Sequence, residues 1–553
     1  MSTRSTRRGR GIAFVATAAL LTLAGCADSD RDSGDDTGSS GSSGGTFVFA
    51  GSADPITLDP FFASDGESFR PARQIFEGLV GTKPGTADPA PLLAKSWQTS
   101  EDGLSTTFEL EEGVKFQDGS DFNAEVACWN FDRWYNTPPG VGQTEDQSYY
   151  WISLFKGFAE GDLTDSVYKS CKVDGDNKIT VSLTQPFAGF VAALSLPSFS
   201  MQSKEAIEKY GATGQEDPSQ SEYATAHPTG TGPFTFVSWE KGTEITLERN
   251  EDYWGEAALL DEVRIIPIAE PKGRADALLN GDIDGFDLVG PADIPRLEDE
   301  GYQVLNRPAF NILYLGINQA VKPLDNIRVR QAIAYAIDKQ AVIDTSMPEG
   351  TEPALEFVPD LVNGYTEDVE QYEYDPEKAK QLLKEAGQEN LTIEFNYPTD
   401  VTRPYMPSAG DTFNAIRSQL EEAGIKVKPQ ADKWDPDYLD KIQGTKDHGI
   451  HLLGWTGDYN DPDNFLGVFF GRKSSEWGFD NPKLFKALEE ARGIPVVEDQ
   501  LPVYQEINRQ VMEFLPGIPL ASPVPSLGFA PEVKGYQPSP VQDEPWNLVS
   551  IEE

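Results

Sequence analysis

Two short segments carry side chains of opposite charge that suit the binding of a small zwitterion. One is TRPY, in which Arg403 offers a guanidinium and Tyr405 an aromatic ring. The other is GWTGDYNDPDNF, in which Trp455 offers an indole and Asp458 a carboxylate. A guanidinium forms charge-assisted hydrogen bonds with a carboxylate, and a carboxylate accepts such bonds from an ammonium. Each charge alone would more simply be a solvated surface group, but together they suit a zwitterion, with Arg403 for its carboxylate and Asp458 for its ammonium.

Both segments follow strands in the sequence pattern. LTIEFNY (391–397) reads as a strand that leads into TRPY, and a helix is expected after it at 411–424. HGIHLLGW (448–455) reads as a buried strand that leads into the second segment. In open α/β sheets, ligands bind outside the carboxyl ends of strands, so we expect both segments at one edge of a sheet.

The expected secondary structure around these segments differs between the two parts of the chain. Up to about residue 310 the chain is strand-rich, and the expected elements are a strand from 46, a helix at 70–80, a hairpin at 105–116 turning at Glu112-Gly113, helices at 123–136 and 201–210, and strands at 177–184 and 242–249. Beyond it, strands alternate with helices, among them a strand at 310–318, one long helix at 326–343 with Asn326 as its N-cap, and a helix opening at Pro376 and ending at Gly387. The alternation predicts βαβ units. The final 30 residues are strand-like again, and they are expected to return to the strand-rich first domain. Two lobes joined by crossovers would leave a cleft, which is a preferred place for a ligand.

Composition narrows the function classes. Lys and Arg total 45 against 90 Asp and Glu, and a net charge of −45 argues against nucleic-acid binding because phosphate backbones are also anionic. Of the three His, His448 and His451 lie on the predicted strand, where a spacing of three would turn them to opposite faces, so no metal site is expected. The chain has no phosphate-binding G-x-x-x-x-G-K-[ST] loop and no G-x-S-x-G elbow. We therefore expect no catalytic residue and no cofactor.

The first 26 residues have the pattern of an export signal. Four Arg residues precede the apolar run 11–23, which is too short to span a bilayer comfortably. Leu-Ala-Gly before Cys26 resembles a bacterial lipobox, which predicts a lipoprotein signal peptide over 1–25 and lipidation of Cys26; an ordinary secretory signal is the alternative. Residues 26–45 are rich in Gly, Ser and Asp and predict a flexible tether. The protein is thus expected to be anchored to a membrane by lipid alone.

Cys128 and Cys171 are the two cysteines that remain. In an oxidising compartment, two cysteines are most simply a disulfide, which here would close a loop of about 40 residues. Such a loop is worth roughly 4 kcal/mol when the bond is unstrained. Two separate buried thiols are the alternative.

Longer motifs resemble one known family. They span nearly all of residues 46–553, and they are LAKSW (93–97), FELEEGVKFQDG (108–119), GTGPF (230–234), NEDYW (250–254), NIRVRQAIAYAIDK (326–339) and YDPEKAKQLLKEAG (374–387). With these motifs the chain resembles the solute-binding proteins of ABC importers in the peptide/nickel-binding family (extracellular solute-binding protein family 5). TRPY and GWTGDYNDPDNF look most like the dipeptide-binding proteins of that family.

The resemblance implies a fold. That fold is α/β, two-lobed and periplasmic-binding-protein-like (type II, cluster C), with an extra subdomain in the first lobe. The first lobe would consist of 46–310 and 521–553, with the subdomain at about 83–229. The second lobe would span 311–520.

The resemblance also implies roles for residues. In dipeptide-binding relatives, the Asp that matches Asp458 receives the ammonium of the peptide, and the Arg that matches Arg403 receives its carboxylate. The first lobe would add a loop, matched more loosely here by Ser64-Asp65-Gly66. The expected ligand-binding residues are therefore Asp458, Arg403, Trp455, Tyr405, Ser64 and Gly66.

The resulting expectation is a receptor and not an enzyme. It would capture dipeptides or short oligopeptides and deliver them to a permease and an ATPase on separate chains. It would be a monomer, lipid-anchored on the extracytoplasmic face of a bacterial cell membrane. Other solutes of the same class are longer peptides, glutathione, haem, nickel and oligosaccharides. A secreted hydrolase and a signalling or chaperone-like lipoprotein are the alternatives outside that class.

Overall fold

The computed structural model describes residues 44–144, 146–213 and 216–552. The predicted signal peptide, Cys26 and nearly all of the predicted tether lie outside the described residues. Within these three ranges, no helix combines the length and the apolar character that crossing a bilayer requires.

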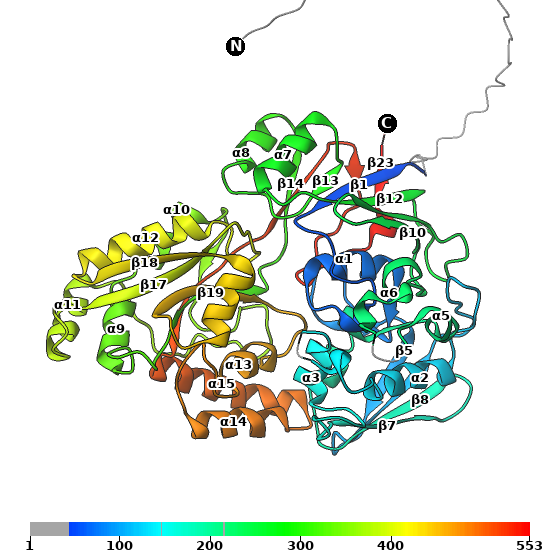
Figure 1. Cartoon of the computed structure of the whole chain (residues 1–553), viewed down its shortest axis with the longest axis horizontal. Helices are drawn as coiled ribbons and strands as arrows, with labels where there is room; N and C mark the ends of the chain where they lie inside the picture. Colours follow the sequence, from blue (N-terminus) through cyan, green and yellow to red (C-terminus); the bar gives the residue numbers. More distant parts are fainter. Residues whose placement is uncertain (1–43, 145, 214–215, 553) are drawn as a thin grey trace, which may run out of the picture. The chain divides into compact units, whose positions relative to one another are not determined.

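A seven-stranded sheet organises the first lobe, in the strand order β10-β11-β12-β1-β13-β21-β14. Its central strand β1 (Thr46–Gly51) runs parallel to both of its neighbours. The other strands are β10 (Phe234–Glu240), β11 (Glu244–Arg249), β12 (Glu262–Pro267), β13 (Gly285–Phe286), β14 (Gln303–Asn306) and β21 (Ser526–Phe529). Because β21 comes from the C-terminal end, the chain returns to this lobe after building the other one (Figure 1).

A separate four-stranded sheet has the order β5-β6-β8-β7. Its residues come between β1 and β10 in the sequence. Its strands are β5 (Ala94–Thr99), β6 (Ser105–Leu110), β7 (Tyr168–Val173) and β8 (Lys178–Leu183). The predicted hairpin over 105–116 is wrong, since β6 ends at Leu110 and pairs with β5 and β8 instead of turning back on itself. Beyond β6, Val114 and Phe116 leave the sheet and are buried in the core of this subdomain.

Helices cover these first-lobe sheets. They are α1 (Gly66–Ile75), α2 (Ala124–Tyr135), α3 (Tyr149–Phe155), α4 (Phe190–Ala193), α5 (Lys204–Tyr210), α6 (Glu222–Ala226), α7 (Pro271–Asn280) and α8 (Ile294–Asp299). The helix expected at 70–80 starts earlier because Asp65 accepts hydrogen bonds from the first free backbone N–H groups of α1. Cys128 of α2 and Cys171 of β7 form a disulfide, with their Cα atoms 5.2 Å apart.

A six-stranded sheet organises the second lobe, in the order β16-β20-β15-β19-β17-β18. Its strands are β15 (Asn311–Ile317), β16 (Glu352–Pro353), β17 (Thr392–Thr399), β18 (Lys426–Lys433), β19 (Ile450–Thr456) and β20 (Gly517–Ser522). β17 runs parallel to β19, so the two strands end at the same edge of the sheet. TRPY and the segment around Asp458 therefore both leave the sheet at that edge.

Helices enclose this sheet on both faces. Alternate β15 residues belong to two cores, since Leu313 packs with α9–α12 and Tyr314 packs with α13–α15. The helices are α9 (Ile327–Tyr335), α10 (Lys339–Ser346), α11 (Pro376–Glu385), α12 (Ala409–Glu422), α13 (Asp463–Phe470), α14 (Pro482–Arg492) and α15 (Val497–Phe514).

The single helix expected at 326–343 is wrong, because the structure has two helices there. Asn326 caps α9 as predicted, by accepting a hydrogen bond from the Arg328 N–H at 3.1 Å. Asp338 then caps a new helix, α10, by accepting from the Ala341 N–H at 3.1 Å. A short acidic side chain competes with the helix for backbone donors, which is why the chain restarts at this position.

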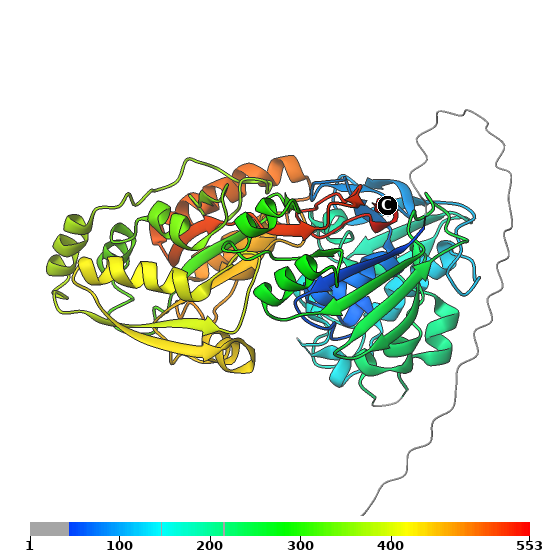
Figure 2. The ribbon, with the colours of Figure 1, turned by 90° about the horizontal axis from the view of Figure 1, so that it is seen from above.

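Two chain segments cross between the lobes, and buried charges hold them. The Arg307 N–H donates to the Pro525 carbonyl at 2.8 Å, so the outgoing and returning segments are bonded to each other (Figures 1 and 2). The Arg307 guanidinium is buried between the Asp287 and Glu544 carboxylates, and Arg70 of α1 also binds Asp287 at 2.6 Å. These cations hold the pKa of Asp287 well below its usual range.

We expect Arg307→Met to lower the free energy of unfolding by about 3–5 kcal/mol, because it leaves two carboxylates buried without their partner. Arg296→Met is the matched control, since Arg296 pairs with Asp276 at the exposed surface, and we expect it to lose at most about 1 kcal/mol. Urea unfolding measures both variants. Equal losses in the two variants would contradict the role given to Arg307.

Candidate functional site

Arg403 sits in a tight turn after β17. Its backbone pairs with that of Met406, through N–O distances of 3.2 and 2.9 Å. The half-buried guanidinium lies over the Trp434 ring, with its carbon 4.7 Å from the ring centre. Among the side chains that the structure describes, no carboxylate forms an ion pair with Arg403. The turn thus holds a cation that stacks on an aromatic ring and keeps its hydrogen-bond donors available.

Tyr405 ties this turn to the neighbouring strand. Its ring is 7% exposed and packs against Gly454 of β19, where an added Cβ would collide with the ring and with the Ile312 carbonyl. Glycine is therefore required at position 454 for the close approach of the two segments. This packing places the TRPY turn directly beside the strand that leads to Asp458.

Asp458 follows β19 and accepts hydrogen bonds from both lobes. The Tyr150 hydroxyl of α3 donates to Oδ1 at 2.7 Å, and the Asn464 Nδ2 of α13 donates to Oδ2 at 3.0 Å. Asn464 also accepts from the Asp458 N–H at 2.8 Å, which fixes the start of the loop. Among the described residues, no Lys, Arg or His pairs with this carboxylate. The carboxylate is thus oriented by neutral donors and keeps acceptor capacity for a cation.

The electrostatic setting of Asp458 favours such a cation. Burial raises the pKa of the Asp458 carboxyl to about 6, although the hydrogen bonds from Asn464 and Tyr150 and the charge of Arg73 work in the opposite direction. A cationic ligand group close to the carboxylate would favour its ionised form. Below about pH 6 the Asp458 carboxyl holds a proton, so the binding of a cation there is linked to the release of that proton.

The other expected residues have different surroundings. Trp455 is half-buried, and its Nε1 approaches the Asn464 side-chain oxygen at 3.5 Å. Ser64 is exposed, and Gly66 begins α1 close to the Gln542 side chain. Burial and the charge of Asp458 raise the pKa of Tyr150, and the charge of Asp65, between Ser64 and Gly66, adds to that rise, so this loop lies within electrostatic range of the Tyr150–Asp458 contact.

One cavity of about 730 Å³ opens beside Asp458. Asp458 and Trp455 line it, whereas Arg403, Tyr405, Ser64 and Gly66 are not among its walls. The structure thus brings two of the six expected residues into this cavity, and it places the Arg403 turn on the neighbouring strand. Sequence reasoning missed Tyr150 and Asn464, because one aromatic residue within a run of them and one amide in a turn look like ordinary packing and capping.

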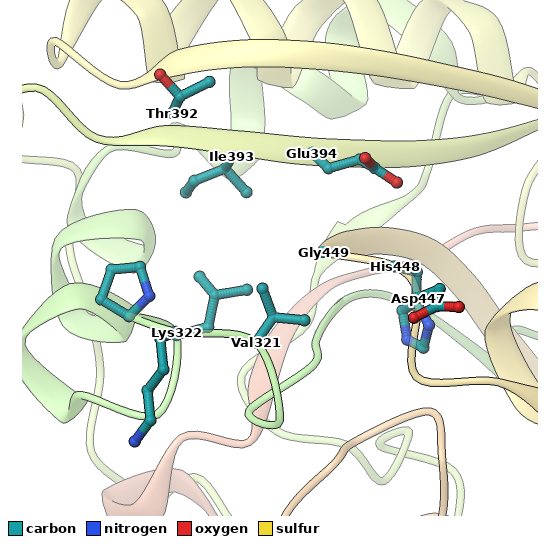
Figure 3. Close-up of a pocket in the computed structure, with 10 residues that line it drawn as sticks. Val321, Lys322, Thr392, Ile393, Glu394, Asp447, His448 and Gly449 are labelled. Atoms are coloured by element: carbon teal, nitrogen blue, oxygen red, sulfur yellow. The ribbon is translucent and has the colours of Figure 1, made fainter.

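A second cavity, of about 280 Å³, lies at the opposite edge of the same sheet (Figure 3). It is lined by the first residues of β17, among them Ile393, and by Asp447–Gly449, which lead into β19. It is therefore a full strand length away from the ends that carry the TRPY turn and Asp458. Its position separates it from the charged pair.

The expectation that His448 and His451 face opposite sides is wrong. His448 lies before β19 and not within it, so the alternation of a strand does not apply, and the two ring centres are 5.1 Å apart. Both rings contact Glu476, and burial lowers the pKa of His448 to about 4. In the described ranges, no group of three or more His, Cys, Asp or Glu is placed to hold a metal ion.

Comparisons with known proteins agree with this architecture. The model of the bacterial extracellular solute-binding proteins, family 5 (Middle), matches residues 88–477. A heme-binding protein A of Haemophilus influenzae is 32% identical over 550 residues, which cover 97% of this chain and 98% of that protein. A dipeptide-binding protein of Escherichia coli is 31% identical over 521 residues, which cover 92% of this chain and 95% of that protein.

A solved structure of similar fold is the ABC transporter-associated periplasmic binding protein DppA of Helicobacter pylori, in complex with the peptide STSA. Its TM-score is 0.76 at 28% identity, and the match covers 92% of this chain and 98% of that one. Fold and site together define a two-lobed solute receptor. The chain belongs to family 5 of the bacterial extracellular solute-binding proteins. Proteins of this family bind solutes for ABC importers outside the cytoplasm and are not enzymes.

The raised pKa of Asp458 makes the stability of the ligand-free protein pH-dependent. Because the folded-state pKa lies above the ordinary value of 3.8, this group stabilises the fold most below about pH 4, and the contribution is lost as pH rises through about 6. We expect the melting temperature of Asp458→Asn, relative to wild type, to rise between pH 4 and pH 7. Scanning calorimetry across that range measures the difference.

Asp480→Asn is the control for that measurement, because Asp480 is exposed and pairs with Lys473 at the surface. Asp461, whose pKa burial raises to about 7, is present in every variant, so its effect cancels in the comparison. A melting-temperature difference for Asp458→Asn that stays constant from pH 4 to pH 7 would contradict the raised pKa.

Proposed function

We propose that this chain captures dipeptides or short oligopeptides between its two lobes. The ammonium of the peptide binds Asp458, and its terminal carboxylate binds Arg403. The names of similar proteins support this class of ligand, since one is a dipeptide-binding protein and another is solved with the peptide STSA. Trp455 and Tyr405 flank these two charges, and Ser64 and Gly66 contribute from the first lobe.

A single observation carries the proposal. Arg403 and Asp458 follow parallel, adjacent strands, and neither charge is neutralised by an ion pair with a described side chain. Partly buried charges without an ionic partner are costly unless a ligand supplies one. A zwitterionic peptide carries both missing partners, and their separation selects its length and direction.

The ligand also couples the two lobes. Residues 46–310 and 521–553 form the first lobe, with a subdomain at about 83–229, and residues 311–520 form the second. Tyr150 of the subdomain reaches Asp458 of the second lobe, so the ammonium site is complete only when the lobes are together. A ligand with higher affinity for that arrangement shifts the population toward it. A permease and an ATPase on separate chains then receive the closed, loaded receptor.

The receptor is a monomer held at the extracytoplasmic face of a bacterial cell membrane. Cleavage before Cys26 removes residues 1–25, and the Cys26 thiol carries the lipid. Residues 26–45, rich in Gly, Ser and Asp, act as the tether between the lipid and the folded part. The lipid is the only contact of this chain with the bilayer.

We expect Arg403→Ala and Asp458→Asn each to weaken the binding of Ala-Ala at pH 7 tenfold or more. Each variant removes a charge-assisted hydrogen bond, which is worth about 1.5–3 kcal/mol. Isothermal titration calorimetry measures the affinities. N-acetyl-Ala-Ala lacks the ammonium, so it should bind wild type weakly and should lose no further affinity in Asp458→Asn.

Arg417→Ala is the matched control for these variants, because Arg417 lies on α12 of the same lobe and pairs with the exposed Glu421. Glutathione, haemin, Ni²⁺ and a short oligosaccharide are titrated in parallel as rival solutes. Tight binding of one of these, without measurable peptide binding, would replace the ligand that we propose. Wild-type affinity for Ala-Ala in both charge variants would remove the assigned roles.

For the anchor, we expect Cys26→Ser to release the protein from the membrane fraction and to abolish labelling with radioactive palmitate. The reason is that this thiol is the proposed site of acylation. Cys128→Ser with Cys171→Ser is the control, because these cysteines form the disulfide inside the folded part. Labelling that persists in Cys26→Ser would show that the lipid is attached elsewhere.

A further inference from the structure

The cavity beside Asp458 extends well beyond the space that an ammonium needs. Its volume of about 730 Å³ falls in the range of small-molecule binding sites. Helix α3 of the first lobe and helices α13 and α14 of the second form its walls. Figure 1 shows α3 beside α13 and α14, and the Arg492 guanidinium joins them by donating to the Leu154 carbonyl at 2.8 Å.

Two helices of the second lobe supply much of the wall. Asn464 and Gly467 line the cavity from α13, and Gly471 lines it from the C-cap of that helix. On α14, Phe485 and Arg492 face the cavity from one stripe of that helix. The cavity is therefore built by helix faces together with the loop that carries Asp458.

The charges of the wall differ in sign from the rest of the chain. The whole sequence has 45 Lys and Arg against 90 Asp and Glu. The cavity wall has more cations than acids, and its charged residues are Lys156, Arg472, Lys486, Arg492, Asp458, Asp463 and Glu489. In a strongly anionic protein, this local reversal makes the cavity the favourable place for an anionic group.

Most of these charges already have partners. Arg492 pairs with Asp463 at 3.5 Å. Lys486 pairs with Glu490 at 2.5 Å, and the charge of Glu489 also acts on it.

Two cations remain, since among the described residues neither Arg472 nor Lys156 forms an ion pair. Arg472 follows the C-cap of α13 and lines the same cavity as Asp458. A glutamate side chain of a ligand held at Asp458 can extend through that cavity toward the long arginine side chain.

We propose that this cavity selects peptides whose N-terminal residue carries an anionic side chain, which it binds through Arg472 and Lys156. The inference rests on the proposed function, which places the peptide ammonium on Asp458. Because Asp458 lines the cavity and Arg403 does not, the N-terminal residue is the one whose side chain enters. Asp458 and Arg403 bind only the two termini of the peptide, so the cavity adds selectivity for a side chain.

The test compares Glu-Ala with its neutral counterpart Gln-Ala by calorimetry at pH 7.5 and low ionic strength. We expect wild type to prefer Glu-Ala about two- to fivefold, the range for an ion pair at an exposed arginine. Arg472→Gln should lower the ratio of the two affinities, and Arg472→Gln combined with Lys156→Gln should bring it to about one. Glu489→Gln removes an acid from the wall and should raise the ratio above that of wild type. Lys473→Gln is the matched control and should keep the wild-type ratio, because Lys473 pairs with Asp480 outside the cavity.

The outcomes separate this inference from the proposed function. Equal affinity of wild type for Glu-Ala and Gln-Ala would overturn the inference and leave peptide capture intact. A preference for Glu-Ala that survives unchanged in the double variant Arg472→Gln with Lys156→Gln would also overturn it, since the selectivity would then come from elsewhere. Failure of wild type to bind either peptide, or Ala-Ala, would overturn the proposed function itself and this inference with it.

Discussion

The structure depends on one partly buried carboxylate that two lobes share. Asp458 belongs to the second lobe, yet one of its oxygens accepts from Tyr150 of the first. Burial raises its pKa to about 6, so close to neutral pH the group can hold a charge although no described cation forms an ion pair with it. A cationic ligand group would stabilise the ionised Asp458 carboxylate, and it would strengthen the contact between the lobes in the same step. In the proposed function, recognition and closure would therefore depend on a single electrostatic interaction.

Buried charges also hold the first lobe at the point where the chain crosses to the second lobe. Arg307 stands where the chain leaves the first lobe, and its partners Asp287 and Glu544 come from segments far apart in sequence. Arg70 binds the same Asp287 from α1, the helix that begins with the Ser64–Gly66 loop. A network of this kind is weak evidence for net stability, but its geometry is specific. It links the crossover to α1, which begins beside Asp65, a charge that acts on Tyr150.

The sequence predicted the strands and helices best where hydrophobic period and capping residues agreed. The strand before TRPY and the strand before Asp458 both formed, and their parallel pairing put both segments at one edge of the sheet. The predictions were wrong where a capping residue or an element boundary interrupted the hydrophobic period. Asp338 restarted a helix that the apolar period would have continued. His448 fell outside the strand, so the alternation rule did not apply to it.

The sequence by itself determined the receptor class, many of the strands and helices and the two charged segments, because these depend on local patterns and motifs that can be read without knowledge of contacts. Only the tertiary structure decided that Tyr150 meets Asp458, a pairing across 308 positions of sequence. It also decided which charges of the cavity wall already have partners and which do not. Such pairings follow from how whole lobes pack, and packing is a property of the entire chain that no local window of residues contains.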